Sequence, residues 1–476
     1  VINDYSRKYI NNLYKYIKEA NFNFKSYMSA NKFYESYALK SNDESEILED
    51  YEEKVLIVSL ALGNGNEELA YNLADKLIKQ EFQPATPTFL NAGRARGGEM
   101  VSCFLINVED SCEGISYAIS SANHLSKIGG GVALNLTRLR ASGEDIKDIQ
   151  GVSGGVVGVA KMLENSFSYF NQMGTRQGAG AVYINILHPD CELLLDTKKI
   201  NADEKIRLAT LSIGIMIPDV FMKLAEENKN AYAFYPHSVF KKYGVNLDEI
   251  DMNAWYDKLA NDCDIRKKEI NPRQLLTRIA QTQQESGYPY VVYIDTANKE
   301  HTLKDVGKIK MSNLCCEIFQ YQTPSDIQGY GGNNNWGQDI SCNLGSLNIA
   351  NVMDNKDIEK TVEVAIKALT FVSDNTNINQ VPTVKKGNDA SHSIGLGAMN
   401  LHGYLVREGI LYTSQEAIDF VNVFFALIRY YAIKTSMNIA IERKETFVGF
   451  EASEYAKGKN SDVLRKYYEV DYLPTT

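Results

Sequence analysis

The sequence contains no uninterrupted apolar run of about 18 or more residues, the length that a membrane-spanning helix requires. Its N-terminus does not show the succession of basic, apolar and small residues that marks a secretory signal peptide. It also lacks an excess of positive charge, because the formal net charge is −10, which argues against bulk binding of nucleic acid. We therefore expect a cytoplasmic protein whose partners are neither a membrane nor a nucleic acid.

Paired cysteine motifs are absent as well. The seven cysteines are scattered, and no Cys-x-x-Cys pair or His/Cys cluster has the spacing of a zinc site or of a secreted disulfide framework. The six histidines include no Glu-x-x-His pair of the kind that holds a di-iron centre in helical bundles. We expect this chain to bind no metal, and each cysteine needs its own explanation.

The size and composition are those of an ordinary folded enzyme. With 476 residues, 44% of them hydrophobic and 23% charged, the chain is longer than a single core usually allows. Residues 1–83 have a helical pattern of apolar residues among charges, and after Pro84 short β-rich runs alternate with helical or glycine-rich stretches. Strands that are apolar along their whole length are typical of a largely parallel α/β sheet or barrel. The sequence thus predicts a helical domain over 1–83 and an α/β domain over 84–476.

Two long helices are expected near the end of the chain, at 358–378 and 414–444. The second begins at Thr413-x-x-Glu416, which is a capping-box pattern. It is apolar on nearly every face, so we expect it to lie inside or against a large neighbour.

An amide, a thiol and a carboxylate stand at alternate positions as Asn313, Cys315 and Glu317. On an extended segment these side chains would point the same way and could together hold a hydroxylated substrate. The carboxylate could take a hydroxyl proton as general base, and the thiol could act as nucleophile or hydrogen-atom donor. The alternative is that Cys315 and Cys316 are small buried hydrophobes and that Glu317 is an exposed charge.

Two further cysteines, Cys103 and Cys342, each lie on an expected strand directly after a serine. They could form a disulfide only if the fold brought their Cα atoms to within about 7 Å of each other. In a reducing compartment such a pair would be a redox-active dithiol rather than a structural crosslink. Core packing is the alternative for each of them.

Together these three elements resemble the active site of ribonucleotide reductase large subunits, and the resemblance covers nearly all of the chain. The stretches that resemble the class Ib branch are residues 84–93, 129–135, 178–181, 196–205 and 394–404. The resemblance implies an α/β ten-stranded barrel, made of two antiparallel five-stranded parallel halves, with an N-terminal helical domain. The reactive cysteine would lie on a finger loop around 311–318.

The resemblance also implies the chemistry. As a thiyl radical, Cys315 would take the 3′ hydrogen atom of a ribonucleoside diphosphate, Glu317 would remove the 3′ hydroxyl proton and Asn313 would orient the sugar. Cys103 and Cys342 would supply two electrons while the 2′ hydroxyl leaves as water, and would end as a disulfide. The substrate-binding positions implied in the same way are Thr86, Ser102 and Gly131.

Cys316 is a departure from the family pattern, because relatives usually carry a different residue between the radical cysteine and the glutamate. Side chains alternate along an extended segment, so its thiol should face away from that of Cys315. We assign it a packing role. The same role is expected for Cys112, Cys191 and Cys263.

Two glycine-rich stretches, 151–155 and 174–180, fit neither a P-loop nor the dinucleotide-binding fingerprint. By resemblance they are the loops that bind a dNTP effector at a homodimer interface and pass its identity to the substrate base. Asp110 would accept a hydrogen bond from the deoxyribose hydroxyl and Arg140 would bind the phosphates, although an ordinary surface ion pair is the alternative for Arg140. The other effector-binding positions implied are Ile146, Gly174, Arg176, Gln177 and Gly178.

The resemblance implies partners that supply what this chain does not hold. The radical would come from a dimanganese or di-iron small subunit, and a glutaredoxin- or thioredoxin-like dithiol would be the external reductant. Relatives carry a phosphate-binding turn, a radical-relaying tyrosine pair and a cysteine-bearing tail beyond the point that matches Thr476. We therefore expect a second polypeptide, or a removed C-terminal portion, to complete the barrel. Two alternatives stay open: an adenosylcobalamin-dependent class II reductase, and an inactive nucleotide-binding fragment of a split reductase.

Overall fold

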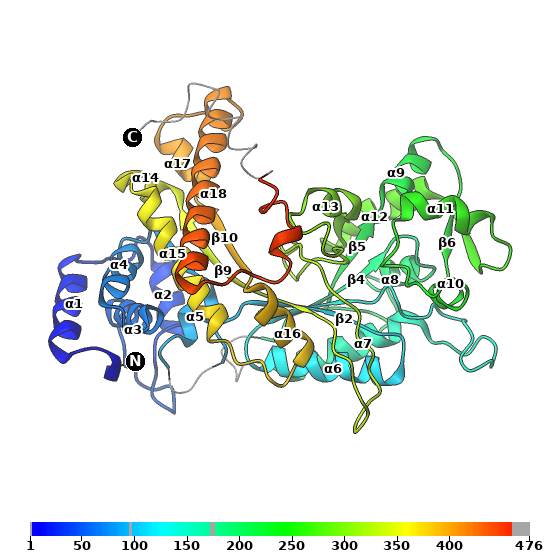
Figure 1. The fold of residues 1–476 in the computed structure, drawn as a ribbon, viewed down its shortest axis with the longest axis horizontal. Coiled ribbons are helices and arrows are strands. Elements are labelled where there is room, and N and C mark those ends of the chain that lie inside the picture. The colour runs from blue at the N-terminus through cyan, green and yellow to red at the C-terminus, as the bar shows by residue number, and fades with distance from the viewer. Residues whose placement is uncertain (1, 95–97, 172–176, 459–476) are drawn as a thin grey trace. The chain divides into compact units, whose positions relative to one another are not determined.

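The computed structural model describes residues 2–94, 98–171 and 177–458, and the chain divides into two compact units (Figure 1). Unit 1 comprises Val1–Ser102, Cys342–Asn377 and Ser391–Thr476, and unit 2 comprises Cys103–Ser341 and Ile378–Ala390. Both units contain residues of the region expected to form the α/β domain. The domain boundary at 83/84 stays a prediction.

Unit 1 begins with helices, as the sequence predicts for this region. Helix α3 packs against both α1 and α4. It begins with a capping box, in which the Asp50 side chain accepts a hydrogen bond from the backbone N–H of Glu53 and the Glu53 side chain accepts one from that of Asp50. The bounds in this region are η1 (Ile2–Asp4), α1 (Arg7–Glu19), α2 (Tyr27–Ser36), α3 (Tyr51–Gly63), α4 (Glu67–Ile78) and α5 (Thr86–Asn91).

The sheet of unit 1 is built on strand β9 (Ile340–Asn348), of which Cys342 onwards belongs to this unit. Strand β1 (Phe82–Pro84) pairs with β9 antiparallel, and β10 (Ile394–Met399) pairs with it parallel. The remaining helices of the unit are α14 (Ile349–Asn355), α15 (Ile358–Asp374), α17 (Leu401–Arg407), α18 (Gln415–Arg443) and η2 (Phe450–Ala452).

Helices α15 and α18 are the two long helices expected near the end of the chain, and they pack against each other. The N-cap of α18 is Ser414, whose side chain accepts from the backbone N–H of Ala417, so the expected capping box at Thr413 is wrong by one position. Phe424 is buried at 2% exposure, whereas Ile441 is 65% exposed. Within the described residues, the apolar surface of this helix is therefore only partly covered.

Unit 2 contains five strands in a single parallel arrangement: β2 (Cys103–Asn107), β3 (Gly131–Asn135), β4 (Gly180–Asn185), β5 (Ser212–Ile217) and β8 (Tyr290–Tyr293). Every residue of the first four strands is buried, which explains why these segments are mostly apolar. Helices α6 (Cys112–Lys127) and α7 (Gly155–Tyr169) pack side by side against β2, β3 and β4 (Figure 1). The expected α/β fold with parallel strands is confirmed.

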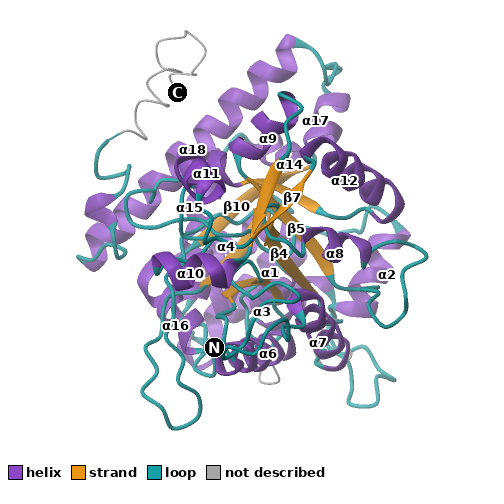
Figure 2. Cartoon of the chain, turned by 90° about the vertical axis from the view of Figure 1, so that its right-hand side faces the viewer, coloured by secondary structure: helices purple, strands orange, loops and turns teal. Residues whose placement is uncertain are grey.

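The connections of unit 2 carry further elements, which Figure 2 draws with helices in purple and strands in orange. A separate antiparallel pair is formed by β6 (Ala231–Phe234) and β7 (Lys267–Ile270). The remaining helices are α8 (Cys191–Asp196), α9 (Asp219–Glu226), α10 (Pro236–Tyr243), α11 (Met252–Asn261), α12 (Pro272–Ser286), α13 (Ile294–Glu300) and α16 (Pro382–Ser391).

One row of residues runs across all five parallel strands in register. Its members, from β2 to β8, are Asn107, Asn135, Tyr183, Gly214 and Tyr290. Residues side by side in a parallel sheet point to the same face, so this row gives one face of an otherwise apolar sheet a polar line.

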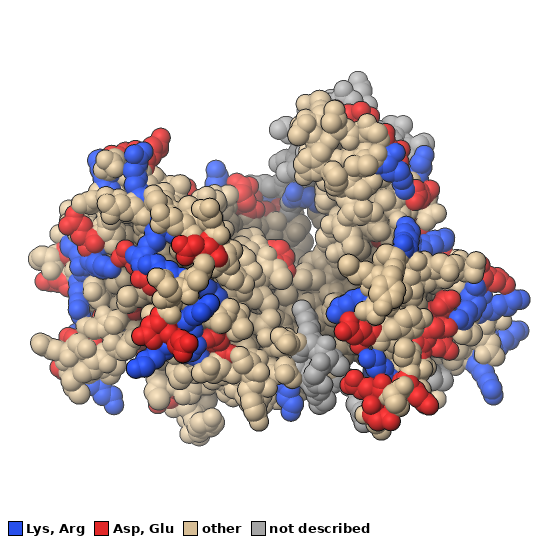
Figure 3. Space-filling view, turned by 180° about the vertical axis from the view of Figure 1, so that it is seen from behind, with Lys and Arg blue, Asp and Glu red and all other residues tan. Residues whose placement is uncertain are grey.

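The described surface carries charges of both signs. On the face that Figure 3 draws, Lys and Arg side chains lie among Asp and Glu side chains toward both sides, and no continuous basic surface is visible there. None of the described helices is long and apolar enough to cross a membrane.

Candidate active site

The segment 311–318 of unit 2 is a turn rather than an extended strand. The backbone N–H of Cys316 donates to the carbonyl of Asn313 at 3.1 Å, and Cys316 has a φ of +63° in the left-handed region. The expected alternation of side chains along an extended segment is therefore wrong. The cause is Asn313, whose Oδ1 accepts from the backbone N–H groups of Glu317 and Ile318 at 2.9 and 3.0 Å and so draws the chain into a turn.

The side chain of Asn313 is completely buried and links the other candidate groups. Its Nδ2 donates to Glu317 Oε1 at 2.7 Å and to Cys103 Sγ at 3.4 Å. Since Oδ1 already accepts two backbone N–H groups, both hydrogens and both lone pairs of the amide are used. In this arrangement the amide is hydrogen-bonded to both the Glu317 carboxylate and the Cys103 thiol.

The two adjacent cysteines have different surroundings. Cys315 and Glu317 are exposed, so the thiol and the carboxylate are both accessible from outside the loop. Cys316 is half-buried, and burial raises the pKa of its thiol, whereas the interaction with the Tyr183 side chain lowers it. The more accessible of the two thiols is thus Cys315.

The sheet of unit 2 supports this loop at three points. A Cβ on Gly131 would lie only 2.9 Å from Cδ2 of Leu314, so the absence of a side chain at Gly131 lets the loop approach β3. The hydroxyl of Tyr183, on β4, donates to the carbonyl of Asn313 at 2.6 Å. Cys103 is the first residue of β2 and lies beside Gly131 in register, which brings its thiol within reach of Asn313.

A buried ionic cluster holds the chain on both sides of the loop. Arg138, whose side chain is 1% exposed, donates to Glu109 at 2.6 Å, to Asp248 at 2.9 Å and to Glu249 at 3.1 Å. On one side of the loop the Lys310 ammonium lies 3.2 Å from Glu249. On the other side the backbone N–H of residue 325 donates to Glu109 at 3.0 Å. Sequence patterns gave no sign of this cluster.

The remaining candidate residues for substrate chemistry belong to unit 1. Cys342 on β9 is buried, and a Cβ at Gly395 of β10 would lie 3.6 Å from its sulfur. The hydroxyl of Thr86 shares a hydrogen bond of 2.9 Å with that of Tyr37. Ser102 is also buried, and its Oγ has no hydrogen-bond partner among the residues that the structure describes. That the Cα atoms of Cys342 and Cys103 lie within about 7 Å of each other stays a prediction.

The two main candidates for effector binding lie together. Nε of Arg140 donates to Asp110 at 2.8 Å, and the backbone N–H of Arg140 donates to the same carboxylate at 3.1 Å. His237 at the start of α10 was not identified from the sequence, and its Nδ1 lies 4.0 Å from Asp110. Both members of the Asp110–Arg140 pair are partly exposed, so a ligand could reach them.

The other effector-binding candidates are placed separately. Ile146 is 38% exposed and forms an isolated antiparallel bridge with Ile149. A Cβ at Gly178 would lie 2.3 Å from the carbonyl of Phe167, so a glycine is needed where this segment passes the end of α7. Gln177 is exposed. Gly174 and Arg176 lie outside the described residues.

Glu144, close to this region, is expected to make stability depend on pH. Its carboxylate accepts from the backbone N–H groups of Ala141 at 2.7 Å and Ser238 at 3.3 Å, yet burial raises its pKa from the ordinary 4.5 to about 7. Between these values the folded chain binds a proton that the unfolded chain has lost, so this group lowers stability as pH rises from 4.5 to about 7. Thermal unfolding at pH 5 and pH 8 should show a smaller pH-dependent change for Glu144→Gln than for the wild type.

The control for this measurement is Asp148→Asn, because the Asp148 side chain is 97% exposed. It should follow the wild type at both pH values. An unchanged pH dependence in Glu144→Gln would contradict the assignment.

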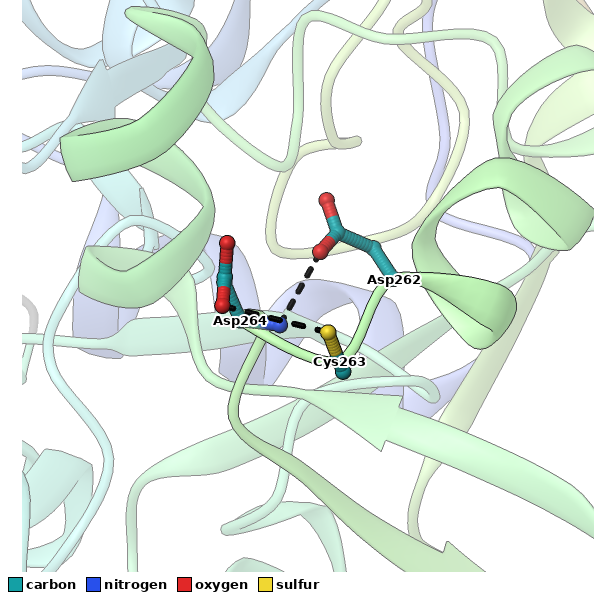
Figure 4. Close-up of side chains that lie close together, drawn as sticks. All are labelled: Asp262, Cys263 and Asp264. Carbon is teal, nitrogen blue, oxygen red and sulfur yellow. Dashed lines mark hydrogen bonds between the residues drawn. The ribbon is translucent and has the colours of Figure 1, made fainter.

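One group of side chains among the described residues has the geometry of a metal site, namely Asp262, Cys263 and Asp264 between α11 and β7 (Figure 4). However, Lys242 contacts Asp262 at 2.6 Å and Asp264 at 2.9 Å. A cation of the protein already pairs with both carboxylates, so we do not assign a metal centre to this group.

The fold and the site together define an α/β protein in which a thiol and a carboxylate are presented on a loop supported by a parallel sheet. Residues 101–471 match the family described as "Ribonucleotide reductase, barrel domain", and residues 23–97 match "Ribonucleotide reductase, all-alpha domain". The chain belongs to the ribonucleotide reductase family. The expected helical N-terminal domain and reductase barrel are thereby confirmed.

Curated relatives agree with this result. The chain is 52% identical over 470 residues to the ribonucleoside-diphosphate reductase subunit alpha of Bacillus subtilis, an alignment that covers 99% of this chain and 67% of the relative. The proteins of the same name from Mycoplasma pneumoniae and Mycoplasma genitalium are 45% and 44% identical, over 99% and 98% of this chain and 65% and 64% of their own lengths. The chain thus spans about two thirds of the length of these relatives.

Proposed function

We propose that this chain is the main part of the α-subunit of a class Ib ribonucleoside-diphosphate reductase. It reduces ribonucleoside diphosphates to 2′-deoxyribonucleoside diphosphates by thiyl-radical chemistry. The observation that carries the proposal is one buried amide, that of Asn313, which bonds to both Glu317 and Cys103 beside the exposed Cys315. The names of the relatives support the same activity.

In the proposed reaction, the Cys315 sulfur forms an S–H bond with the 3′ hydrogen atom of the substrate and leaves a carbon radical. Glu317 takes the 3′ hydroxyl proton as general base, and its exposure allows it to reach the sugar. Asn313 keeps the carboxylate in place, because its Nδ2 donates a hydrogen bond to Glu317 Oε1 at 2.7 Å.

Cys103 and Cys342 then give up two electrons and two protons and form a disulfide, while the 2′ hydroxyl leaves as water. A glutaredoxin- or thioredoxin-like dithiol restores the two thiols. The radical is supplied from outside the chain by a dimanganese or di-iron small subunit. After turnover, Cys315 regains the radical state and the 3′ hydrogen atom returns to the product.

Ser102, Thr86 and Gly131 form the proposed substrate contacts. A buried hydroxyl without a partner costs roughly 1–3 kcal/mol, and a substrate oxygen at Ser102 would remove that cost. The Thr86 hydroxyl, which bonds to Tyr37, can accept a second partner. Gly131 would contact the substrate through its backbone, because Leu314 takes the space that its missing side chain leaves.

For the effector site, the proposal is that a dNTP binds at Asp110, Arg140, Ile146 and the segment that contains Gln177 and Gly178, at a homodimer interface. Arg140→Ala should weaken dNTP binding by about 10- to 100-fold, the effect of removing a charge-assisted hydrogen bond. Equilibrium binding of a labelled dNTP measures this. Lys241→Ala is the control, because the Lys241 side chain is 74% exposed and lies 4.0 Å from the exposed Asp148. Equal affinity in the wild type and Arg140→Ala would contradict the site.

The experiment that tests the function is an assay of the complete reductase that contains this chain. With a dimetal small subunit, a dithiol and a dNTP, we expect reduction of ribonucleoside diphosphates. Turnover with adenosylcobalamin and no small subunit would show a class II enzyme instead. Retained dNTP binding with no turnover under either condition would identify a nucleotide-binding relative without catalytic activity.

A further inference from the structure

The ring of Tyr183 is held rigidly by the sheet of unit 2. Tyr183 is completely buried on β4, and its register partner on β5 is Gly214. A Cβ at Gly214 would lie 2.3 Å from Cε1 of the ring, so the ring occupies the space that this glycine leaves. The hydroxyl at the end of the ring is therefore fixed relative to the strands.

This hydroxyl acts on the carbonyl that closes the finger-loop turn. The Asn313 carbonyl accepts from the Tyr183 hydroxyl at 2.6 Å and from the backbone N–H of Cys316 at 3.1 Å, so both of its lone pairs are used. Burial, and then the neighbouring Cys316 thiol, raise the pKa of Tyr183 above its ordinary value, so the hydroxyl keeps its proton and stays a donor.

The Tyr183 side chain also contacts Cys316, the residue of the turn whose backbone is strained. Cys316 has a left-handed backbone with a φ of +63°, which favours glycine over other residues. Its half-buried thiol lies beside the Tyr183 side chain, and each group shifts the pKa of the other. Tyr183 thus contacts the loop at two points on either side of Cys315, whose own side chain is left exposed.

We infer that Tyr183 is a positioning residue that holds the finger loop against the sheet and so sets the location of the Cys315 sulfur. The inference rests on the proposed function for the reaction that Cys315 performs. A reacting atom displaced by about 1 Å can lower a rate by on the order of 100-fold, so loss of one hydroxyl behind the loop should be visible in turnover.

The test compares Tyr183→Phe with Tyr256→Phe in the complete reductase. Tyr256 is the control, because it is 6% exposed and its hydroxyl also hydrogen-bonds to the backbone, where it accepts from the N–H of Tyr232 at 2.8 Å. We would measure kcat and KM for a ribonucleoside diphosphate, dNTP affinity, and the rate at which iodoacetamide alkylates Cys316 in the folded protein.

Tyr183→Phe should lower kcat by about 10-fold or more while KM and dNTP affinity change by less than about 3-fold. Alkylation of Cys316 should become about 5-fold faster or more, because the thiol loses a partner that orders it. Tyr256→Phe should change none of these by more than about 2-fold. Unchanged kcat and alkylation in Tyr183→Phe, or equal losses in both variants, would overturn the inference. If the wild type reduces no nucleotide, the proposed function fails, and the alkylation rates alone decide whether Tyr183 positions the loop.

Discussion

Cys315→Ser should lower the turnover of the complete reductase by on the order of 1,000-fold or more, the scale on which removal of a reacting group acts. The O–H bond of serine is too strong for its hydrogen atom to be exchanged with a sugar carbon, whereas the weaker S–H bond of a thiol allows this exchange. Cys316→Ser should keep most of the activity, because its side chain contacts Tyr183 rather than the exposed side of the loop. The measurement is kcat for a ribonucleoside diphosphate at saturating dNTP.

Binding of dNTP serves as the control, since the proposed effector site at Asp110 and Arg140 is formed by other segments of the chain than the loop at 311–318. Both variants should bind dNTP as the wild type does. Comparable loss of turnover in both variants would show that Cys316 is also essential to the reaction or to the turn. Retained turnover in Cys315→Ser would refute the assignment of the radical thiol.

Arg138→Met should destabilise the folded chain by about 3–5 kcal/mol, the cost of leaving buried charges without their partner. Arg138 faces three carboxylates, those of Glu109, Asp248 and Glu249, with its own side chain 1% exposed. The shift in the midpoint of denaturant unfolding at neutral pH measures the effect. The loss should be smaller at acidic pH, where the orphaned carboxylates can take up protons.

The control is Arg407→Met, which removes an ion pair with Asp354 whose side chains are 41% and 57% exposed. Exposed pairs contribute at most about 1 kcal/mol, so this variant should unfold close to the wild type. Similar destabilisation in both variants would show that the buried cluster of Arg138 does not depend on the arginine charge.

Most strands of the α/β region could be predicted because buried parallel strands are apolar along their whole length. The apolar runs at 131–139 and 209–217, for example, contain β3 (Gly131–Asn135) and β5 (Ser212–Ile217). Strand β10 was not predicted, since Ile394–Met399 alternates glycine with apolar residues and has a weak β pattern. The short strands β6 and β7 were not predicted either, because each is stabilised by antiparallel pairing with the other rather than marked by its own composition.

The candidate residues of the site could be named from the sequence, but the shape of the segment that carries them could not. The expectation of an extended segment was wrong, because the Asn313 amide oxygen accepts hydrogen bonds from backbone N–H groups four and five residues further on. Tyr183 and Arg138 were missed because their partners lie far along the chain, Asn313 at a separation of 130 residues and Asp248 at 110. Such contacts leave no local pattern.

These separations also bear on how the protein folds. The contacts of Asn313 with Tyr183 and Cys103 span 130 and 210 residues. The strands that carry these partners, β4 and β2, belong to a parallel sheet, in which long crossover segments connect the strands. Closing such large loops costs chain entropy before any contact compensates for it, and proteins rich in distant contacts fold slowly. The loop with Cys315 therefore gains its hydrogen bonds with Tyr183 and Cys103 only after β4 and β2 have joined the sheet. During synthesis and refolding, this thiol is among the last groups to reach its final surroundings.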